Sequence, residues 1–318
     1  MNRTEAVSPE AVSPAAGQSL PDAEDGAFAL TRRLLATRAP RFTGRHGVEV
    51  HSLVSADHVP LYLFAAKSLA RHWPEVTPVV HDDGTLTGRD TARLRRHVPE
   101  ARIIGRADAD RRVEALLVDH PVLRAVRRNN VRVLQLVDYF LLSEASMVVG
   151  MDSDVVFLSR PATLIEWAAA PPARRPAFLY SPEFGWEPQG VHWIAEHLPG
   201  TPYVPYMCCG FAAADTAAFF DPAFLERILA ALPREISFAP RYVTQMAYSL
   251  LGGRLGEDRT LDLGEPYRSG RLSWLPAIED RVICHYFASH ERSSAFDNLA
   301  GEGPLLRRAL GLAPDTAG

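Results

Sequence analysis

Cysteine and lysine are scarce in this 318-residue sequence, which has three cysteines and a single lysine, Lys67. Cys208, Cys209 and Cys284 are too few and too unevenly spaced for a disulfide framework or a structural zinc site, so we expect a reducing, cytoplasmic location. No apolar run is long enough to cross a bilayer, and the first residues lack the basic-then-apolar pattern of a secretory signal. A formal net charge of -4 gives no reason to expect a nucleic-acid partner.

The rest of the composition is that of an ordinary globular protein, with 47% hydrophobic and 23% charged residues. Residues 1–25 are rich in Ala, Ser, Pro, Glu and Asp and have almost no large apolar side chains. Such a segment cannot bury enough surface to fold, so we predict a disordered tail. Residues 26–318 are predicted to form a single domain, and no internal repeat is present.

Short apolar runs alternate with amphipathic segments along the chain, which predicts an α/β fold with a mostly parallel sheet flanked by helices. In the first half we expect strands at 48–54, 77–80, 101–104 and 147–151, with helices at 59–72, 90–97, 111–120 and 131–146. In the second half we expect strands at 177–180, 211–214 and 282–287, with helices at 222–232 and 241–251.

The segment Asp152-Ser153-Asp154 interrupts an apolar stretch directly after the predicted strand 147–151. Two carboxylates beside a core are costly unless something neutralises them, and a divalent cation that also holds a phosphate-bearing ligand would do so. The alternative is that both are loop acids at a strand end, one of them capping the next turn. The position straight after a buried strand favours the metal-binding interpretation.

Polar side chains also follow the first two predicted strands. Ser55 and Asp57 come after the first, and Asp82 and Asp83 after the second. Because ligands bind beyond the carboxyl ends of parallel strands, these groups are candidates for contacts to a base or a ribose. For Asp83, which precedes Gly84, a simple turn is the commoner explanation of such a pair.

His285 lies alone in the apolar run 282–287. A single histidine in such a strand is more often a satisfied core group than a metal ligand. Further donors for a phosphate or a metal follow closely in Ser289, His290 and Arg292.

Taken together in chain order, these segments resemble the nucleotide-sugar-dependent glycosyltransferases of the GT-A fold. They are most similar to the glycogenin and lipopolysaccharide galactosyltransferase group, family eight. The segments that carry the resemblance are 53–57, 134–139, 151–161, 209–211, 244–245 and 283–286. They span most of residues 48–295, and the D-x-D segment is the best matched of them.

The resemblance implies transfer of a sugar from a nucleotide diphosphate donor, a UDP-sugar being favoured, to a glycan, a lipid-linked glycan or a small molecule. It implies Mn²⁺, or Mg²⁺, held by Asp152, Asp154 and His285 between the enzyme and both phosphates. The donor site implied by the resemblance consists of Ser55, Asp57, Asp83, Asp152 and Ser153, with Arg132 or Arg292 as a second positive charge. Gln245 stands where the family has a glutamine at a helix start, which implies a catalytic role.

Two features leave the catalytic groups open. An inverting enzyme needs a general base, for which Asp215 and Glu183 are the available acids, whereas the resemblance favours retention. Thr244 replaces an acidic residue of the family, and Gln135 stands where the family has a basic one.

A different class of enzyme shares the D-x-D pattern. Phosphohydrolases with an aspartyl nucleophile would use Asp152 as the nucleophile and Asp154 as the acid and base. Their motif normally ends the first strand of the domain and needs a lysine further along the chain. Here three strands are predicted before it, and no lysine follows Lys67.

Overall fold

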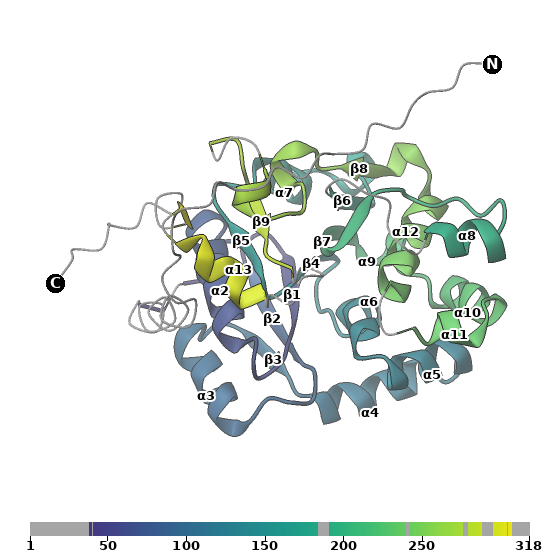
Figure 1. Cartoon of the computed structure of the whole chain (residues 1–318). Coiled ribbons are helices and arrows are strands. Elements are labelled where there is room, and N and C mark those ends of the chain that lie inside the picture. Colours follow the sequence, from purple (N-terminus) through teal and green to yellow (C-terminus); the bar gives the residue numbers. More distant parts are fainter. Residues whose placement is uncertain are drawn as a thin grey trace, which may run out of the picture.

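The structure is a computed structural model that describes residues 38–39, 41–183, 191–239, 242–275, 279–287, 295–303 and 305–306. The predicted tail of residues 1–25 lies outside this part of the chain. Seven strands form the central sheet, in the order β3-β2-β1-β4-β7-β6-β8 (Figure 1). Their bounds are β1 Val48–Val54, β2 Thr77–Asp82, β3 Arg102–Ile104, β4 Met147–Met151, β6 Phe178–Pro182, β7 Met207–Asp215 and β8 Thr260–Asp262.

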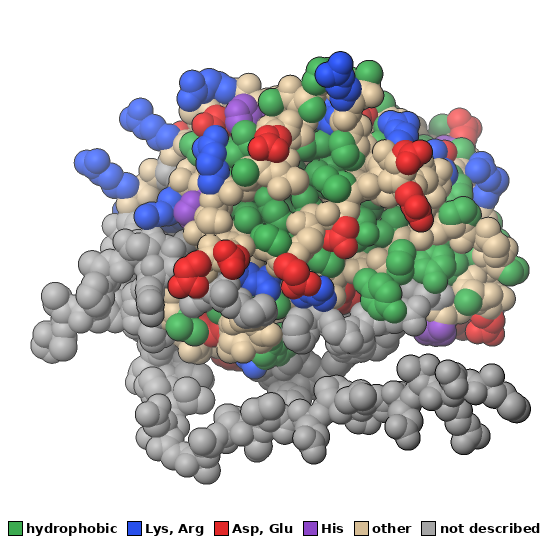
Figure 2. Space-filling model, turned by 90° about the horizontal axis from the view of Figure 1, so that it is seen from above, with side chains coloured by type: hydrophobic (Ala, Val, Ile, Leu, Met, Phe, Trp, Pro, Cys, Tyr) green, Lys and Arg blue, Asp and Glu red, His purple; other side chains and the backbone are tan. Residues whose placement is uncertain are grey.

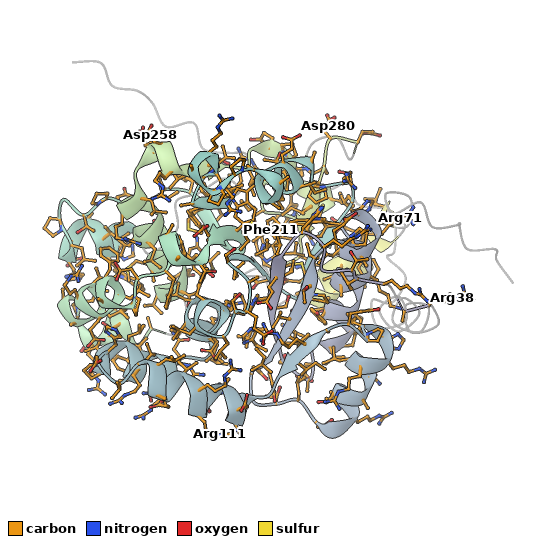
Figure 3. All side chains as sticks on the ribbon, turned by 180° about the vertical axis from the view of Figure 1, so that it is seen from behind. Arg38, Arg71, Arg111, Phe211, Asp258 and Asp280 are labelled. Carbon is orange, nitrogen blue, oxygen red and sulfur yellow. The ribbon has the colours of Figure 1, made fainter. Side chains whose placement is uncertain are left out.

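Strand β4 lies at the centre of the sheet, and all five of its residues are buried. It pairs in parallel with β1 and antiparallel with β7, with Met151 opposite Phe211. Strands β1, β2 and β3 also run parallel, so the prediction of a mostly parallel α/β sheet is confirmed. Phe211 lies in the middle of the molecule (Figure 3). A second, two-stranded sheet joins β5 Val155–Phe157 to β9 Ile283–His285 in antiparallel orientation.

Helices cover both faces of the sheet, and each face has its own apolar core. One core contains side chains of α2, α3, α7 and α13, and the other contains side chains of α4, α5, α6, α10 and α12. The helix bounds are α2 Val59–His72, α3 Gly88–His97, α4 Arg106–Leu116, α5 Pro121–Asn129, α6 Leu134–Leu141, α7 Ala162–Ala169, α8 Val191–His197, α9 Thr216–Phe219, α10 Pro222–Ala231, α11 Arg234–Ser237, α12 Val243–Leu255 and α13 Ala295–Gly301.

The predicted bounds hold best where the sequence pattern is cleanest. The strands at 48–54 and 147–151 and the helix at 59–72 agree with β1, β4 and α2 at both ends. The bounds predicted for the helix at 111–120 are wrong at both ends. Helix α4 begins at Arg106, directly after its N-cap residue Gly105, and ends at Leu116. Helix α5 is absent from the prediction although Pro121 begins it, a position in which proline is favourable.

The helix predicted at 131–146 is also too long. Residues Val131–Val133 form a 3-10 turn, η1, and α6 ends at Leu141. The chain leaves the helix there because Ser143 and the amide of Glu144 both donate to the buried carboxylate of Glu49.

A polar network runs through the sheet at the level of Glu49. His51 Nε2 lies 3.0 Å from Glu49 Oε2, and His51 Nδ1 lies 2.8 Å from His81 Nε2 on β2. Arg102 donates to the other oxygen of Glu49 at 2.7 Å. Both imidazoles are buried, so burial lowers the pKa of His51 and, together with His51, lowers the pKa of His81 well below its usual value.

The surface carries charges of both signs. On the face seen from above, basic and acidic side chains are interspersed with hydrophobic ones (Figure 2). Among the helices that the structure describes, none is both long enough and apolar enough to cross a membrane.

Candidate functional site

Three predicted metal ligands converge beyond the end of β4. Asp152, Asp154 and His285 each offer one ligand atom, and these atoms all lie within 4.8 Å of one another. His285 Nε2 is 3.2 Å from Asp154 Oδ1 and 3.5 Å from Asp152 Oδ2. The structure therefore brings together residues that are 131 positions apart at the edge where the parallel strands end.

Two of these ligand atoms, Asp154 Oδ1 and His285 Nε2, are buried and have no hydrogen-bond partner among the described residues. Burial by itself lowers the pKa of His285, but the carboxylate of Asp154 raises it, and the net shift is well above the usual value. Buried polar atoms are normally paired, because an unsatisfied group costs about 1–3 kcal/mol. A cation bound to both Asp154 Oδ1 and His285 Nε2 would satisfy these two atoms.

The short sheet β5-β9 sets this geometry. Val155, the residue after Asp154, lies opposite His285, and the amide of Tyr286 donates to the carbonyl of Asp154 at 3.0 Å. The other ring nitrogen, His285 Nδ1, lies 3.1 Å from Ser269 Oγ and 3.5 Å from Cys208 Sγ. The ring is thus held from behind while Nε2 points at the carboxylates, as in metal-binding histidines.

Gly210 on β7 leaves the space in which the ligands meet. A Cβ at this position would lie 2.2 Å from His285 Cε1 and 2.8 Å from Asp152 Oδ2, so no larger residue fits. The carbonyl of Gly210 also accepts from the amide of Asp152 at 2.8 Å. The small residue before the predicted strand 211–214 is therefore required by the site itself.

Helix α6 supports Asp152 from the other side. Gln135 donates to Asp152 Oδ1, and the Gln135 carbonyl accepts from Tyr248 of α12 at 2.9 Å. Burial raises the pKa of Asp152, but His285 and then Arg132 lower it below its usual range. Arg132 thus acts on the charge of Asp152, and its contact with a diphosphate stays a prediction.

The cluster fits a divalent cation. It combines carboxylate oxygens, which suit Mg²⁺ and Mn²⁺, with an imidazole nitrogen, which suits Mn²⁺ better. The buried, unpaired Asp154 Oδ1 and His285 Nε2 are the atoms that such an ion would satisfy.

The loop after β1 reaches the D-x-D segment through a residue that the prediction missed. His58 Nδ1 lies 3.2 Å from Ser153 Oγ, between the two aspartates of the motif. Ser55 is half-buried and uses its carbonyl to accept from the amide of His58, whereas Asp57 is exposed. The order of the strands is the only signal that would have linked His58 to Ser153.

Asp83 lies at the same edge but is part of its own turn. Its Oδ1 accepts from the amide of Thr85 at 2.9 Å and from Thr85 Oγ1 at 2.6 Å. Thr85 Oγ1 also accepts from the amide of Ala56 at 2.9 Å, which ties the loops after β1 and β2 together. This geometry agrees with the turn interpretation of Asp83, and a contact of Asp83 to a nucleotide stays a prediction.

The two candidate acids, Glu183 and Asp215, lie at opposite ends of the sheet. Asp215 is opposite Met147, the first residue of β4, where it caps α9 and pairs with Arg175 at 3.2 Å. That places it on the order of 15 Å along the strand from Asp152 and outside the site. Glu183 directly follows β6 at the site edge, where its carboxylate accepts from Gln245 at 2.9 Å.

Gln245 thus contacts Glu183, and its catalytic role stays a prediction. Its Nε2 also donates to the carbonyl of Met207 at 2.8 Å. Arg292, the other predicted cation, lies outside the described residues, as do Ser289 and His290.

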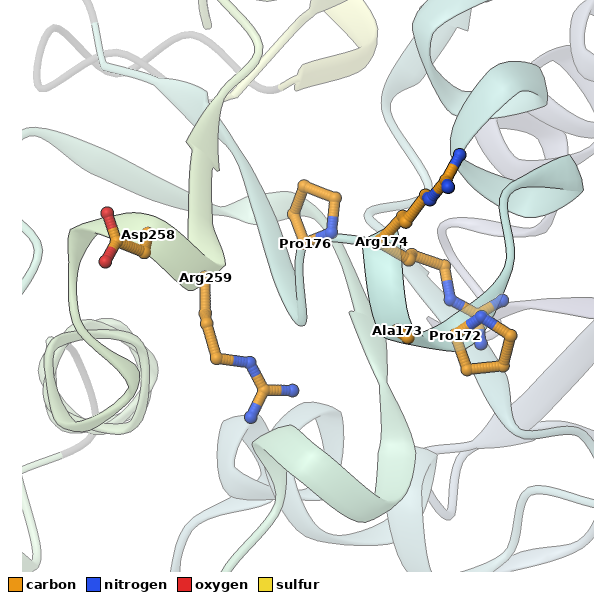
Figure 4. A pocket seen from close by; sticks show the side chains of 7 residues that line it. Pro172, Ala173, Arg174, Pro176, Asp258 and Arg259 are labelled. Carbon is orange, nitrogen blue, oxygen red and sulfur yellow. The ribbon is translucent and has the colours of Figure 1, made fainter.

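A separate pocket of about 300 Å³ lies at the far ends of β6 and β8, lined by residues 172–176, Asp258 and Arg259 (Figure 4). These residues precede the two strands, whereas Glu183 follows β6. The length of β6 thus separates this pocket from the candidate site.

No protein-family model and no curated protein matches this chain. Solved structures that resemble it are glycosyltransferases at low sequence identity. The galactosyltransferase LgtC, solved with donor and acceptor sugar analogues, is 14% identical with a TM-score of 0.47, covering 84% of this chain and 98% of its own. Mouse xyloside xylosyltransferase 1 is 12% identical with a TM-score of 0.46, covering 77% of this chain and 97% of its own.

The glycosyltransferase GlyE of Streptococcus pneumoniae is 11% identical with a TM-score of 0.47, covering 85% of this chain and 66% of its own. These three proteins are glycosyltransferases, the class of enzyme that segments 53–57, 134–139, 151–161, 209–211, 244–245 and 283–286 resemble.

Proposed function

We propose that this chain is a metal-dependent glycosyltransferase that uses a nucleotide diphosphate sugar, with a UDP-sugar favoured. One observation carries the proposal: Asp152, Asp154 and His285 bring their ligand atoms within 4.8 Å of one another where the parallel strands end, and Asp154 Oδ1 and His285 Nε2 are buried without a hydrogen bond from the described residues. Such a cluster has the donor set of a site for Mn²⁺ or Mg²⁺ at the sheet edge where nucleotides bind in α/β folds.

The bound cation would act as a Lewis acid that stabilises negative charge on the departing diphosphate. The chain's own residues prepare the site. Gln135 holds the carboxylate of Asp152, the carbonyl of Gly210 holds the backbone amide of Asp152, and Ser269 holds the ring of His285. Arg132 adds positive charge on the side of α6.

The loops after β1 and β2 supply the remaining donor contacts in this proposal. Ser55, Asp57 and Asp83 lie at that edge, and His58 connects the first loop to Ser153. The acceptor is a glycan, a lipid-linked glycan or a small molecule in this proposal.

The phosphohydrolase alternative is not favoured by any contact in the structure. Three strands precede the D-x-D segment in the sheet, as predicted. The only lysine, Lys67, lies on α2 and donates its Nζ to the carbonyl of Arg38 at 3.3 Å. It is therefore engaged elsewhere and is not placed to stabilise a phosphoaspartate.

A thermal-shift titration tests the proposal directly. UDP and GDP are added with and without Mn²⁺ to the wild-type protein, to Asp154→Ala and to Asp280→Ala. Asp280 is an exposed residue at the periphery of the molecule (Figure 3), so it is a matched aspartate control. A ligand at 100 times its Kd stabilises the folded state by about 2.7 kcal/mol, which is readily seen as a rise in Tm.

We expect one nucleotide to raise Tm only when Mn²⁺ is present, in the wild type and in Asp280→Ala but not in Asp154→Ala. Equal Mn²⁺-dependent shifts in all three proteins would show that the metal binds elsewhere. The absence of any nucleotide shift, combined with Mg²⁺-dependent hydrolysis of p-nitrophenyl phosphate, would replace the proposal with the phosphohydrolase.

A further inference from the structure

Two carboxylates flank the first residues of β7 at the site edge. Asp152 follows β4 on one side of β7, and Glu183 follows β6 on the other side. The register places Met151 opposite Phe211 and Pro182 opposite Met207. Gly150 of β4 and Tyr180 of β6 both lie opposite Ala212 of β7, and the register of β6 shifts after Tyr180. Because neighbouring strands are about 4.8 Å apart, β4 and β6 are roughly 10 Å apart at the level of Ala212.

The surface between these carboxylates is formed by small side chains. Gly210 has none, and Cys209 is half-buried next to it. Burial raises the pKa of the Cys209 thiol, and Cys208, Asp152 and Glu183 raise it further. Cys209 and Gly210 thus lie between a candidate metal-binding carboxylate and a second carboxylate.

The side chain of Glu183 is held in one orientation. Gln245 Nε2 donates to Glu183 Oε2 at 2.9 Å and to the carbonyl of Met207 at 2.8 Å, so the amide itself is fixed at two points. The Glu183 amide donates to the carbonyl of Tyr206 at 2.6 Å. Tyr206 has φ of +52°, a conformation that is uncommon for a residue with a side chain and that concentrates at binding sites.

The charge of Glu183 is not paired with an arginine side chain in the part of the chain that is described. Arg268 Nη1 donates only to the Glu183 backbone carbonyl, while its Nε donates to Glu265. Burial raises the pKa of Glu183, and the hydrogen bond from Gln245 partly offsets this. Within the described residues Oε1 has no hydrogen-bond partner, so this oxygen is available to a ligand.

We propose that Glu183, oriented by Gln245, recognises hydroxyl groups of the transferred sugar and thereby determines which sugar the site accepts. This inference rests on the proposed function, because it assumes a diphosphate bound at the Asp152, Asp154 and His285 cluster. A carboxylate accepts hydrogen bonds from two hydroxyls at once, and hydrogen bonds to a charged group are about twice as strong as neutral ones. The ligand class is therefore a neutral, polyhydroxylated sugar on the nucleotide.

The test compares nucleotide and nucleotide-sugar binding by calorimetry in Mn²⁺. The probes are UDP, UDP-glucose and UDP-galactose, or GDP, GDP-mannose and GDP-fucose if GDP is the nucleotide that stabilises the protein. The variants are Glu183→Gln, which keeps the shape of the side chain, and Glu144→Gln, an exposed glutamate away from the site. We expect Glu183→Gln to bind the free diphosphate within twofold of the wild type.

For at least one nucleotide-sugar, we expect Glu183→Gln to raise the Kd tenfold or more and Glu144→Gln to leave it unchanged. Equal weakening of the diphosphate and the nucleotide-sugar would overturn the inference, because the substitution would then act on the whole site. Unchanged affinity for every nucleotide-sugar would also overturn it while leaving the proposed function intact. Failure of the wild type to bind any nucleotide in Mn²⁺ overturns the proposed function and this inference together.

Discussion

Gly210→Ala is the sharpest single test of the metal-site geometry. The added Cβ would lie 2.2 Å from His285 Cε1, far inside any tolerated contact, and 2.8 Å from Asp152 Oδ2. The backbone at Gly210 is not in the left-handed region, so alanine can adopt its conformation and only the added methyl group matters. The substitution therefore isolates the steric requirement of the site.

The neighbours cannot move aside freely. Ser269 holds the ring of His285, and Gln135 holds the carboxylate of Asp152. Overpacking of this kind costs about 1–3 kcal/mol of unfolding free energy. Because the methyl group pushes apart two of the three ligand residues, we expect the Kd for Mn²⁺ to rise at least tenfold, which is about 1.4 kcal/mol.

Calorimetric titration with Mn²⁺ and urea unfolding in its absence measure the two effects separately. Gly88→Ala is the matched control, because a Cβ at Gly88 meets nothing within 4 Å. We expect it to leave Mn²⁺ binding unchanged and to leave stability unchanged or slightly raised. If Gly210→Ala bound Mn²⁺ as tightly as the wild type, the ion could not lie between Asp152 and His285.

Two further predictions concern Ser269, which contacts the metal-binding histidine, and His81, which is buried in the sheet. Ser269→Ala removes the partner of His285 Nδ1, so we expect Mn²⁺ affinity to fall about 10–100-fold by calorimetry, and an unchanged Kd would contradict this role. His81 is neutral in the folded state because its pKa is depressed. In the unfolded chain the His81 imidazole is protonated below about pH 6.5, so the free energy of unfolding decreases as the pH falls. Urea unfolding between pH 7 and 5 measures the free energy of unfolding of the wild type and of His81→Gln. We expect the slope of this free energy against pH to be smaller in His81→Gln, by about 1.4 kcal/mol per pH unit, and equal slopes would refute this role of His81.

The sequence predicts the centre of the sheet well because strand β4 has a strong local pattern. Strand β4 is a short, fully apolar run that ends in two acids, and such a run reads clearly as a buried strand. The role of His285 as a metal ligand has no such local pattern, because no second candidate ligand stands at a fixed spacing from this single histidine. Its contact with Asp154 follows from the pairing of β5 with β9, which brings distant segments together.

The sequence does not predict which strand lies beside which, and the errors come from there. Asp215, one of the two acids available as a general base, follows the predicted strand 211–214. Strand β7 runs antiparallel to β4, so its first residues, not its last, lie at the site edge. The same reversal brings Cys209 and Gly210 to the site and gives Glu183 its place across from Asp152.

Helix α12 joins the two sides of the site in a way that only the strand order reveals. Gln245 and Tyr248 lie one turn apart on it, so their side chains leave the same face. Gln245 contacts Glu183 beyond β6, and Tyr248 contacts the carbonyl of Gln135, which in turn holds Asp152 beyond β4. Helix α12 thus fixes the carboxylates of Asp152 and Glu183 relative to each other across β7. The position of α12 is set by its packing in the apolar core and not by either carboxylate. The distance between the metal-binding side and the Glu183 side is therefore a property of the helix packing, and a ligand held between them meets a preformed site.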